Sequence, residues 1–247
     1  MNYFCAKSYK ISLILKMKHI VITGASSGIG LYLSQNLIKQ NKVYGLCRKR
    51  PNIKNSNFIF IKTNLKNFKN LSTSINKIKK ADVLINNAGI SKSNKKKNLE
   101  KFNEVLHMNL NVPYHLSEIL KNKLRVSKNP SIINICSLSS HLGFPNNPGY
   151  VASKGGLFSL TKALAIDYSS FKIRVNSVSP GYIKTKMTAK SFANKKESKI
   201  RIDKTILKRW GKPDDVLGII EYLISKKSSY VTGQDFKIDG GYTAKGL

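Results

Sequence analysis

Short apolar runs alternate with longer segments of mixed polarity from residue 17 onward, a pattern typical of β–α–β units around a parallel sheet. The run His19–Ile22 predicts a first buried strand, and apolar residues recur at helical spacing between Gly28 and Lys39. Further apolar runs predict strands at 43–47, 58–61, 82–86, 131–135, 173–178 and 235–238, and we expect helices at 99–124, 149–168 and 213–225. The pattern therefore predicts an α/β fold, a Rossmann fold with a doubly wound, seven-stranded parallel sheet flanked by helices.

Residues 1–16 lie outside this pattern. Their apolar stretch at 11–15 is too short for a signal peptide, and no small-residue cleavage site follows it. Met17 directly precedes the first strand, so 1–16 are either a disordered N-terminal extension or the product of a misassigned start. We expect one domain over 17–247 and no membrane span, since no apolar run approaches the roughly 20 residues that a span requires.

Two charge-rich segments lack strand or core-helix patterning. Residues 94–97 predict a surface loop. Residues 184–204 lie where a mobile segment would cover a substrate.

A glycine-rich turn follows the first predicted strand. The sequence from Thr23 to Gly30 has glycines at positions 24, 28 and 30 and opens the first predicted helix. Glycine permits the tight turn and lets backbone N–H groups approach a pyrophosphate at the helix N-terminus. Such a turn also occurs for packing reasons, so alone it is only a moderate indication of a dinucleotide site.

Further motifs follow in a fixed order along the chain: Asn86–Gly89, Tyr150–Lys154, Ser179–Thr185, Val231–Gln234 and Asp239–Gly241. Together with the glycine turn, the sequence resembles the classical short-chain dehydrogenase/reductase family from Met17 to the C-terminus. Within that family the pattern most resembles the 3-oxoacyl-acyl-carrier-protein reductases, especially at 180–188 and 209–216. These segments also recur in relatives that act on sugars and other alcohols, so they indicate the scaffold better than the substrate.

The residues after the second strand bear on the choice of cofactor. An acidic side chain there can hold the free 2′-hydroxyl of NAD(H), whereas a cation accommodates the 2′-phosphate of NADP(H). Here Cys47 is followed by Arg48, Lys49 and Arg50, which favours NADP(H), with the alternative that Arg48 is one more exposed cation. The glycine turn and the resemblance together assign cofactor contacts to Gly24, Ser26, Ser27, Gly28, Ile29, Gly30, Asn64, Leu65, Asn87, Ala88, Gly89, Pro180, Gly181, Ile183 and Thr185, besides Tyr150 and Lys154.

Tyr150 and Lys154 are four residues apart, which places both side chains on one face of a helix. An ammonium group beside a phenol lowers the phenol pKa, so we expect Lys154 to favour proton transfer by Tyr150. Ser137 ends the fifth predicted strand at the position of the family's catalytic serine, with Ser139 and Ser140 as competitors. Asn109 matches the family's helix asparagine, which holds a water behind the lysine, although a purely structural role stays open.

The resemblance implies a mechanism in which hydride passes from the nicotinamide to a substrate carbonyl carbon while Tyr150 protonates the oxygen. Ser137 would hold that oxygen, and the reverse reaction would use Tyr150 as base. We expect further substrate contacts from His141, Leu142 and Phe144 and from the segment after Thr185. The histidines have no metal-ligand spacing, so we expect no metal.

The chain is lysine-rich, with 44 Lys and Arg against 12 Asp and Glu and a formal charge of +32. Such a field attracts nucleic acid, an anionic membrane surface or an acidic carrier. The lysines are spread along the chain, which favours a solvated surface and makes a nucleic acid partner unexpected. The cysteines at 5, 47 and 136 are odd in number and widely separated, which fits a reducing cytoplasm.

We therefore expect an NADP(H)-dependent oxidoreductase that interconverts a carbonyl and a secondary alcohol, with a small or carrier-linked substrate. The alternatives are a relative acting on a sugar, nucleotide-sugar or other small alcohol, a purely structural subunit, and a catalytically silent dinucleotide-fold protein that binds polyanions. Family members usually assemble as tetramers through the helices that carry Asn109 and Tyr150, so we also expect a homotetramer or dimer.

Overall fold

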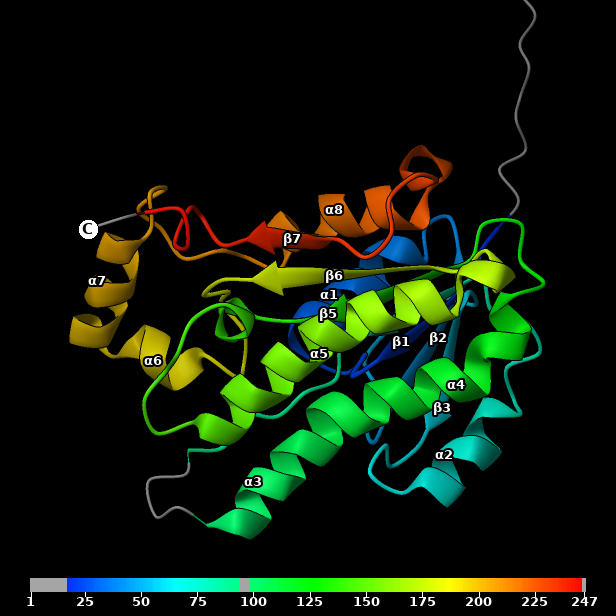
Figure 1. The fold of residues 1–247 in the computed structure, drawn as a ribbon, viewed down its shortest axis with the longest axis horizontal. Coiled ribbons are helices and arrows are strands. Elements are labelled where there is room, and N and C mark those ends of the chain that lie inside the picture. Colours follow the sequence, from blue (N-terminus) through cyan, green and yellow to red (C-terminus); the bar gives the residue numbers. More distant parts are fainter. Residues whose placement is uncertain (1–16, 94–97, 246–247) are drawn as a thin grey trace, which may run out of the picture.

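The computed structural model describes residues 17–93 and 98–245 and contains one seven-stranded parallel sheet (Figure 1). The strands lie in the order β3-β2-β1-β4-β5-β6-β7, which reverses direction between β1 and β4. Their bounds are β1 His19–Thr23, β2 Lys42–Cys47, β3 Phe58–Lys62, β4 Val83–Asn86, β5 Ser131–Ile135, β6 Arg174–Pro180 and β7 Asp235–Ile238. All seven predicted strands are confirmed, and so is the doubly wound Rossmann fold. The segments 1–16 and 94–97 lie outside the described residues.

Helices cover both faces of the sheet (Figure 1). One apolar core lies between the sheet and α2, α4 and α5, and a second lies between the sheet and α1 and α8. Along β1 the side chains alternate, with Val21 in the first core and Ile20 and Ile22 in the second, as a strand buried on both faces requires. The helices are α1 Gly28–Leu37, α2 Phe68–Ile75, α3 Leu99–Leu106, α4 Val112–Leu124, α5 Pro148–Asp167, α6 Ala189–Ala193, α7 Lys195–Lys204 and α8 Asp214–Ile224.

The single helix that we predicted at 99–124 is interrupted. A π-helical turn, His107–Asn111, joins α3 to α4. A π turn carries one extra residue per turn and is often found at functional sites. Here it contains Asn109, whose side chain is fully buried and bonded to the loop that follows β4.

The segment 184–204, predicted to be a mobile cover, contains the two helices α6 and α7. Trp210 fixes them to the body of the protein, because its indole N–H donates to Ser198 at 2.8 Å and its ring meets Phe192 edge-on. The Arg201 guanidinium also lies 4.8 Å from the centre of the Tyr182 ring. The sequence prediction missed these helices because they carry no continuous apolar face, and aromatic contacts from outside the segment hold them.

Candidate active site

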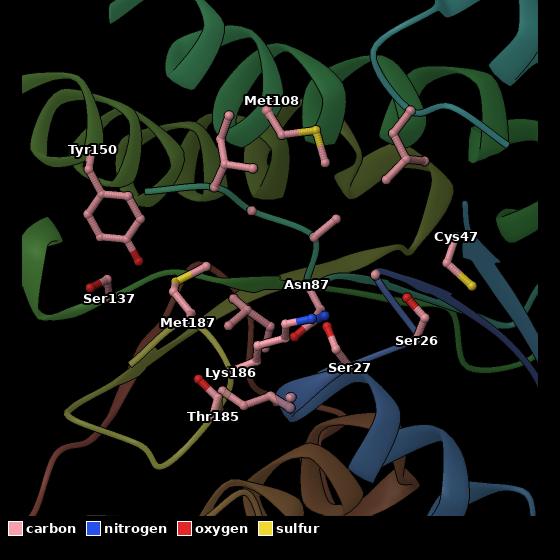
Figure 2. A pocket seen from close by; sticks show the side chains of 18 of the residues that line it. Ser26, Ser27, Cys47, Asn87, Met108, Ser137, Tyr150, Thr185, Lys186 and Met187 are labelled. Atoms are coloured by element: carbon pink, nitrogen blue, oxygen red, sulfur yellow. The ribbon is translucent and has the colours of Figure 1, made fainter. Parts of the chain in front are cut away.

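A cleft of about 510 Å³ runs along the carboxyl ends of the strands, across the point where the strand order reverses (Figure 2). In an open α/β sheet this is where ligands bind, because the loops diverge there and leave a crevice. Loops that follow β1, β2, β3, β4, β5 and β6 all contribute to its walls. Most of the residues that we predicted from the sequence line it, and the exceptions are Gly30, Asn109, His141, Leu142 and Phe144.

The glycine turn after β1 forms a tight cradle. Gly24 and Gly28 have φ angles of 70° and 55°, in the region that favours glycine. Gly30 does not face the cleft but allows close packing, since a Cβ there would lie 2.5 Å from the Gly24 carbonyl oxygen. Ser27 precedes α1 and its side chain makes no capping bond, so the first N–H groups of the helix point to the cleft without a side-chain acceptor.

The loop after β4 is fixed to the end of β1. The backbone N–H groups of Asn87 and Ala88 both donate to Thr23 Oγ1, at 3.0 and 2.9 Å, and Asn87 Nδ2 donates to the Thr23 carbonyl at 2.9 Å. These bonds hold Asn87–Gly89 opposite the glycine turn. A helix N-terminus, glycine backbone and this second wall together fit a dinucleotide, with the pyrophosphate at the start of α1.

The far end of the cleft is lined by Arg48, Asn64 and Leu65. Arg48 is exposed at the end of β2. Among the described lining residues the one carboxylate is Glu104, whose pKa is lowered to about 2 by hydrogen bonds from Lys66 and Lys92. Each of its two oxygens already accepts a hydrogen bond from a lysine ammonium group.

Ser137, Tyr150 and Lys154 meet at the other end. The Tyr150 hydroxyl points toward Ser137 (Figure 2). Ser137 is the second residue after β5, and Tyr150 lies in the first turn of α5. Lys154, buried one turn further along, donates from Nζ to the Ile135 carbonyl at 2.6 Å and lies 5.9 Å from the Tyr150 ring centre.

Burial raises the pKa of Tyr150, and the hydrogen bond from Ser137 opposes that rise. We expected Lys154 to hold the Tyr150 pKa down, and the net shift is upward instead. The loss of water around the buried phenol outweighs the lowering by Ser137. Burial lowers the pKa of Lys154 in turn. The protein presents a neutral phenol that can donate a proton to an oxygen in the cleft.

Asn109 lies beside this group but outside the cleft. Its Oδ1 accepts from the Ile90 N–H at 2.8 Å, and its Nδ2 donates to the Ile90 carbonyl at 2.9 Å and to Ser153 Oγ at 3.0 Å. A Cβ on Gly89 would lie 3.3 Å from Asn109 Oδ1 and 3.7 Å from Lys154 Nζ, so the amide and the ammonium flank the same glycine. The predicted water behind Lys154 stays a prediction.

The three predicted substrate residues after the serine turn do not line the cleft. His141 instead bonds Asp235, with 2.9 Å between Nε2 and Oδ2, while Leu142 is exposed. Sequence reasoning missed the lining residue Met108. Lys186 and Met187 also line the cleft, and they lie in the segment after Thr185 from which we expected substrate contacts. In the view of Figure 2 the Met187 side chain projects toward the end of the cleft that holds Ser137 and Tyr150.

In the part of the chain that the structure describes, no three His, Cys, Asp or Glu side chains come together as metal ligands do. Within the same residues, no helix combines the length and apolar character needed to cross a bilayer.

A family model described as enoyl-(acyl carrier protein) reductase matches residues 53–243. The 3-oxoacyl-[acyl-carrier-protein] reductase of Rickettsia bellii is 35% identical over 90% of this chain and 95% of its own. The chain belongs to the short-chain dehydrogenase/reductase family. The reductase of the same name from Buchnera aphidicola is 34% identical over 89% of this chain and 95% of its own.

Solved structures of other family members have the same fold. A 4-hydroxyisoleucine dehydrogenase complexed with NADH is 35% identical, with a TM-score of 0.87 over 93% of this chain and 100% of its own. The aldohexose dehydrogenase of Thermoplasma acidophilum is 28% identical, with a TM-score of 0.87 over 93% of this chain and 95% of its own. With the residues gathered in the cleft, this membership makes the protein an oxidoreductase that uses NAD(P)(H).

Proposed function

We propose that this short-chain dehydrogenase/reductase reduces a 3-oxoacyl group carried as a thioester on an acyl carrier protein, with NADPH as hydride donor. The observation that carries the proposal is the identity of about one third, over nine tenths of both chains, to reductases of that name. The cleft supports it, because a pair of hydroxyls at one end faces an approach lined by the apolar Met187.

The residues of the chain divide the reaction between them. When bound, NADPH supplies a hydride to the carbonyl carbon. Ser137 holds the carbonyl oxygen by a hydrogen bond, and Tyr150 gives that oxygen its proton as the C=O π electrons move onto it. The products are a secondary alcohol and the Tyr150 phenolate. The phenolate then regains its proton from solvent by a route that passes Lys154 and Asn109. In the reverse direction the phenolate removes the alcohol proton.

The preference for NADPH over NADH is supported at the β2 end of the cleft. Arg48 lies there, and Glu104, the one carboxylate among the lining residues that the structure describes, is already bonded to two lysines. We expect Arg48→Ala to raise the KM for NADPH about tenfold, the size of one charge-assisted phosphate contact, and to leave that for NADH unchanged. Lys49→Ala, which changes a neighbour outside the lining, is the control. Equal KM increases for both cofactors would contradict the assignment.

We also propose that the protein is cytoplasmic and a homotetramer or dimer. Exposed apolar side chains support an interface on α4 and α5, where Tyr114 is 49% and Ile166 is 74% exposed. The formal charge of +32 suits an acidic carrier protein as partner. Light scattering of the purified protein tests the assembly, and a monomeric mass at assay concentration would refute it.

A second candidate is the interconversion of a small hydroxy acid or sugar with its ketone. It is favoured by the 4-hydroxyisoleucine dehydrogenase structure, which is as similar in sequence as the reductases and is complexed with NADH. Under this alternative the protein prefers NADH to NADPH, and its substrate is a small molecule and not a carrier-linked thioester.

One screen separates the two candidates. NADPH and NADH oxidation are followed with acetoacetyl-acyl-carrier protein, acetoacetyl-coenzyme A, a keto-sugar, an aliphatic ketone and a small keto acid. We expect the highest kcat/KM with the carrier-linked thioester and NADPH. A higher value with the keto acid or keto-sugar would favour the second candidate. Steeply salt-dependent DNA binding without turnover of any substrate would favour a non-enzymatic role.

A further inference from the structure

A buried acid–imidazole cluster lies behind the turn that begins at Ser137. His141 Nε2 and Asp235 Oδ2 are 2.9 Å apart, and both side chains are largely shielded, at 18% and 7% exposure. The other carboxylate oxygen, Oδ1, accepts from the hydroxyls of Ser177 at 2.5 Å and Ser179 at 2.9 Å. Two hydroxyls of β6 and one imidazole from beyond the Ser137 turn therefore converge on one carboxylate.

The cluster is no second reaction site. None of its four side chains lines the cleft that holds Ser137 and Tyr150. His141 Nε2 is occupied by Asp235 and also lies 3.4 Å from Ser179 Oγ, so it is not free to activate a nucleophile. What the cluster does is join strands β6 and β7 to the chain just beyond Ser137.

The Ser137 turn is held at both of its ends. At its start, the Cys136 N–H donates to the Val178 carbonyl at 2.7 Å, which continues the pairing of β5 with β6. Ser137 then caps a 3₁₀ turn, Leu138–Ser140, by accepting from the Ser139 N–H at 3.2 Å. At the end of the turn, the His141 N–H donates to the Leu138 carbonyl at 2.9 Å.

Past this turn the chain has few fixed points, because Leu142 and Gly143 are exposed. The His141 side chain provides the far anchor, through Asp235 and through edge contact with the Phe158 ring, 5.0 Å between centres. Without this anchor the turn keeps its tie at Cys136 and the bond from the Ser140 hydroxyl to the Lys154 carbonyl at 2.9 Å, but its far end is no longer joined to β6 and β7. The hydroxyl of Ser137 is part of the same turn, so its direction depends on these ties.

We propose that His141 and Asp235 are positioning residues that hold the Ser137 hydroxyl toward Tyr150 and the substrate oxygen. The inference rests on the proposed role of Ser137 in catalysis. A misplacement of about 1 Å in a reacting geometry can cost on the order of 100-fold in rate. We expect the cost to fall mainly on kcat, because the glycine turn after β1 and the loop after β4 are held together by bonds to Thr23 and not by this cluster.

The first test compares three variants in NADPH-dependent reduction of the best substrate. His141→Ala is expected to lower kcat about 10- to 100-fold and to leave the dissociation constant for NADPH, measured by fluorescence, within about twofold. Asp235→Asn should lower kcat to a similar extent, because the new amide N–H group would face His141, Ser177 and Ser179, which all donate to the carboxylate in the wild type. His141→Gln should retain most of kcat, since a glutamine N–H can reach the carboxylate as Nε2 does.

The second test is a double-mutant cycle with Ser137→Ala. If His141 acts through Ser137, adding His141→Ala to Ser137→Ala should lower kcat by less than about twofold further. A full additional loss would overturn the positioning role, and so would a folded His141→Ala enzyme with unchanged kcat. Should His141→Ala fail to fold, His141→Asn replaces it, because that side chain is too short to reach Asp235. Wild-type turnover by Ser137→Ala itself would instead refute the proposed function.

His19→Ala is the matched control. His19 is a partly buried histidine that bonds the Tyr44 hydroxyl at 3.1 Å and stacks on its ring, but it lies at the start of β1, at the opposite edge of the sheet from the cleft. We expect its loss to lower the melting temperature without changing kcat. An equal kcat loss in His19→Ala and His141→Ala would show a general effect of destabilisation and overturn the inference.

Discussion

Replacing Gly30 by alanine tests how tightly the glycine turn is packed. A Cβ at this position would lie 2.4 Å from Asn87 Nδ2 and 2.5 Å from the Gly24 carbonyl oxygen, whereas ordinary contact begins at 3.4 Å. To reach ordinary contact the two separations must open by about 1.0 and 0.9 Å. Asn87 is held by its bond to the Thr23 carbonyl and the Gly24 oxygen belongs to the backbone, so neither can yield freely.

The expected magnitude follows from two opposing terms. Overpacking of this kind costs about 1–3 kcal/mol, and alanine in a helix returns roughly 0.5–1 kcal/mol relative to glycine. We expect a net loss of about 1–2 kcal/mol, which lowers the melting temperature by about 3–8 °C in a chain of this size. Because Asn87 and the turn line the cofactor cradle, NADPH should also bind at least tenfold more weakly.

Thermal melts and fluorescence titration of NADPH measure both effects. Gly218→Ala is the control, because Gly218 lies within α8 and a Cβ there meets nothing within 4 Å. That variant should gain about 0.5–1 kcal/mol and bind NADPH as the wild type does. A Gly30→Ala protein as stable as Gly218→Ala, with unchanged NADPH affinity, would refute the packing argument.

Two further predictions concern stability. Asp215 accepts two 2.7 Å hydrogen bonds from Arg209, which lower its pKa to about 2. The ionised carboxylate therefore stabilises the folded state above the unfolded-state pKa of about 4, and this stabilisation is lost as pH falls toward 2. Asp215→Asn should lower the free energy of unfolding by about 1 kcal/mol at pH 7 and by much less at pH 2, measured in urea, and a difference independent of pH would speak against the ion pair. Asn109→Ala should lower the free energy of unfolding by about 2–3 kcal/mol in the same assay, because it leaves the Ile90 N–H and carbonyl without their partner. A loss under about 0.5 kcal/mol would show that these backbone groups find other partners.

The sheet could be predicted because its strands are short runs with several apolar residues, and β1, β4 and β5 are buried over almost their whole length. Helix α2 was not predicted, although Phe68, Leu71 and Ile75 have helical spacing and Asn67 caps the helix by accepting from the Asn70 N–H at 3.0 Å. The helix has only eight residues and lies between a strand and the next apolar run, so its helical spacing was overlooked. The π turn around Asn109 has no sequence signature, since it depends on a bond to Ile90.

The motif residues of the site were predictable because their spacing along the strands and helices brings them to one edge of the sheet. We expected His141 to contact the substrate, and its pairing with Asp235 could not be predicted, because the two residues are 94 positions apart and nothing in the local sequence indicates the pair. The pKa direction of Tyr150 was also out of reach, since burial, which spacing does not reveal, decides it.

The central claim is that Tyr150 transfers the proton at the end of a cleft that binds the dinucleotide. The most direct measurement is single-turnover oxidation of bound NADPH by the preferred carbonyl substrate in the wild type and in Tyr150→Phe, with the NADPH dissociation constant determined for both. Loss of the general acid predicts a rate lowered about 100- to 10,000-fold, with NADPH affinity within about threefold of the wild type. A Tyr150→Phe enzyme that oxidises NADPH at the wild-type rate would contradict the claim.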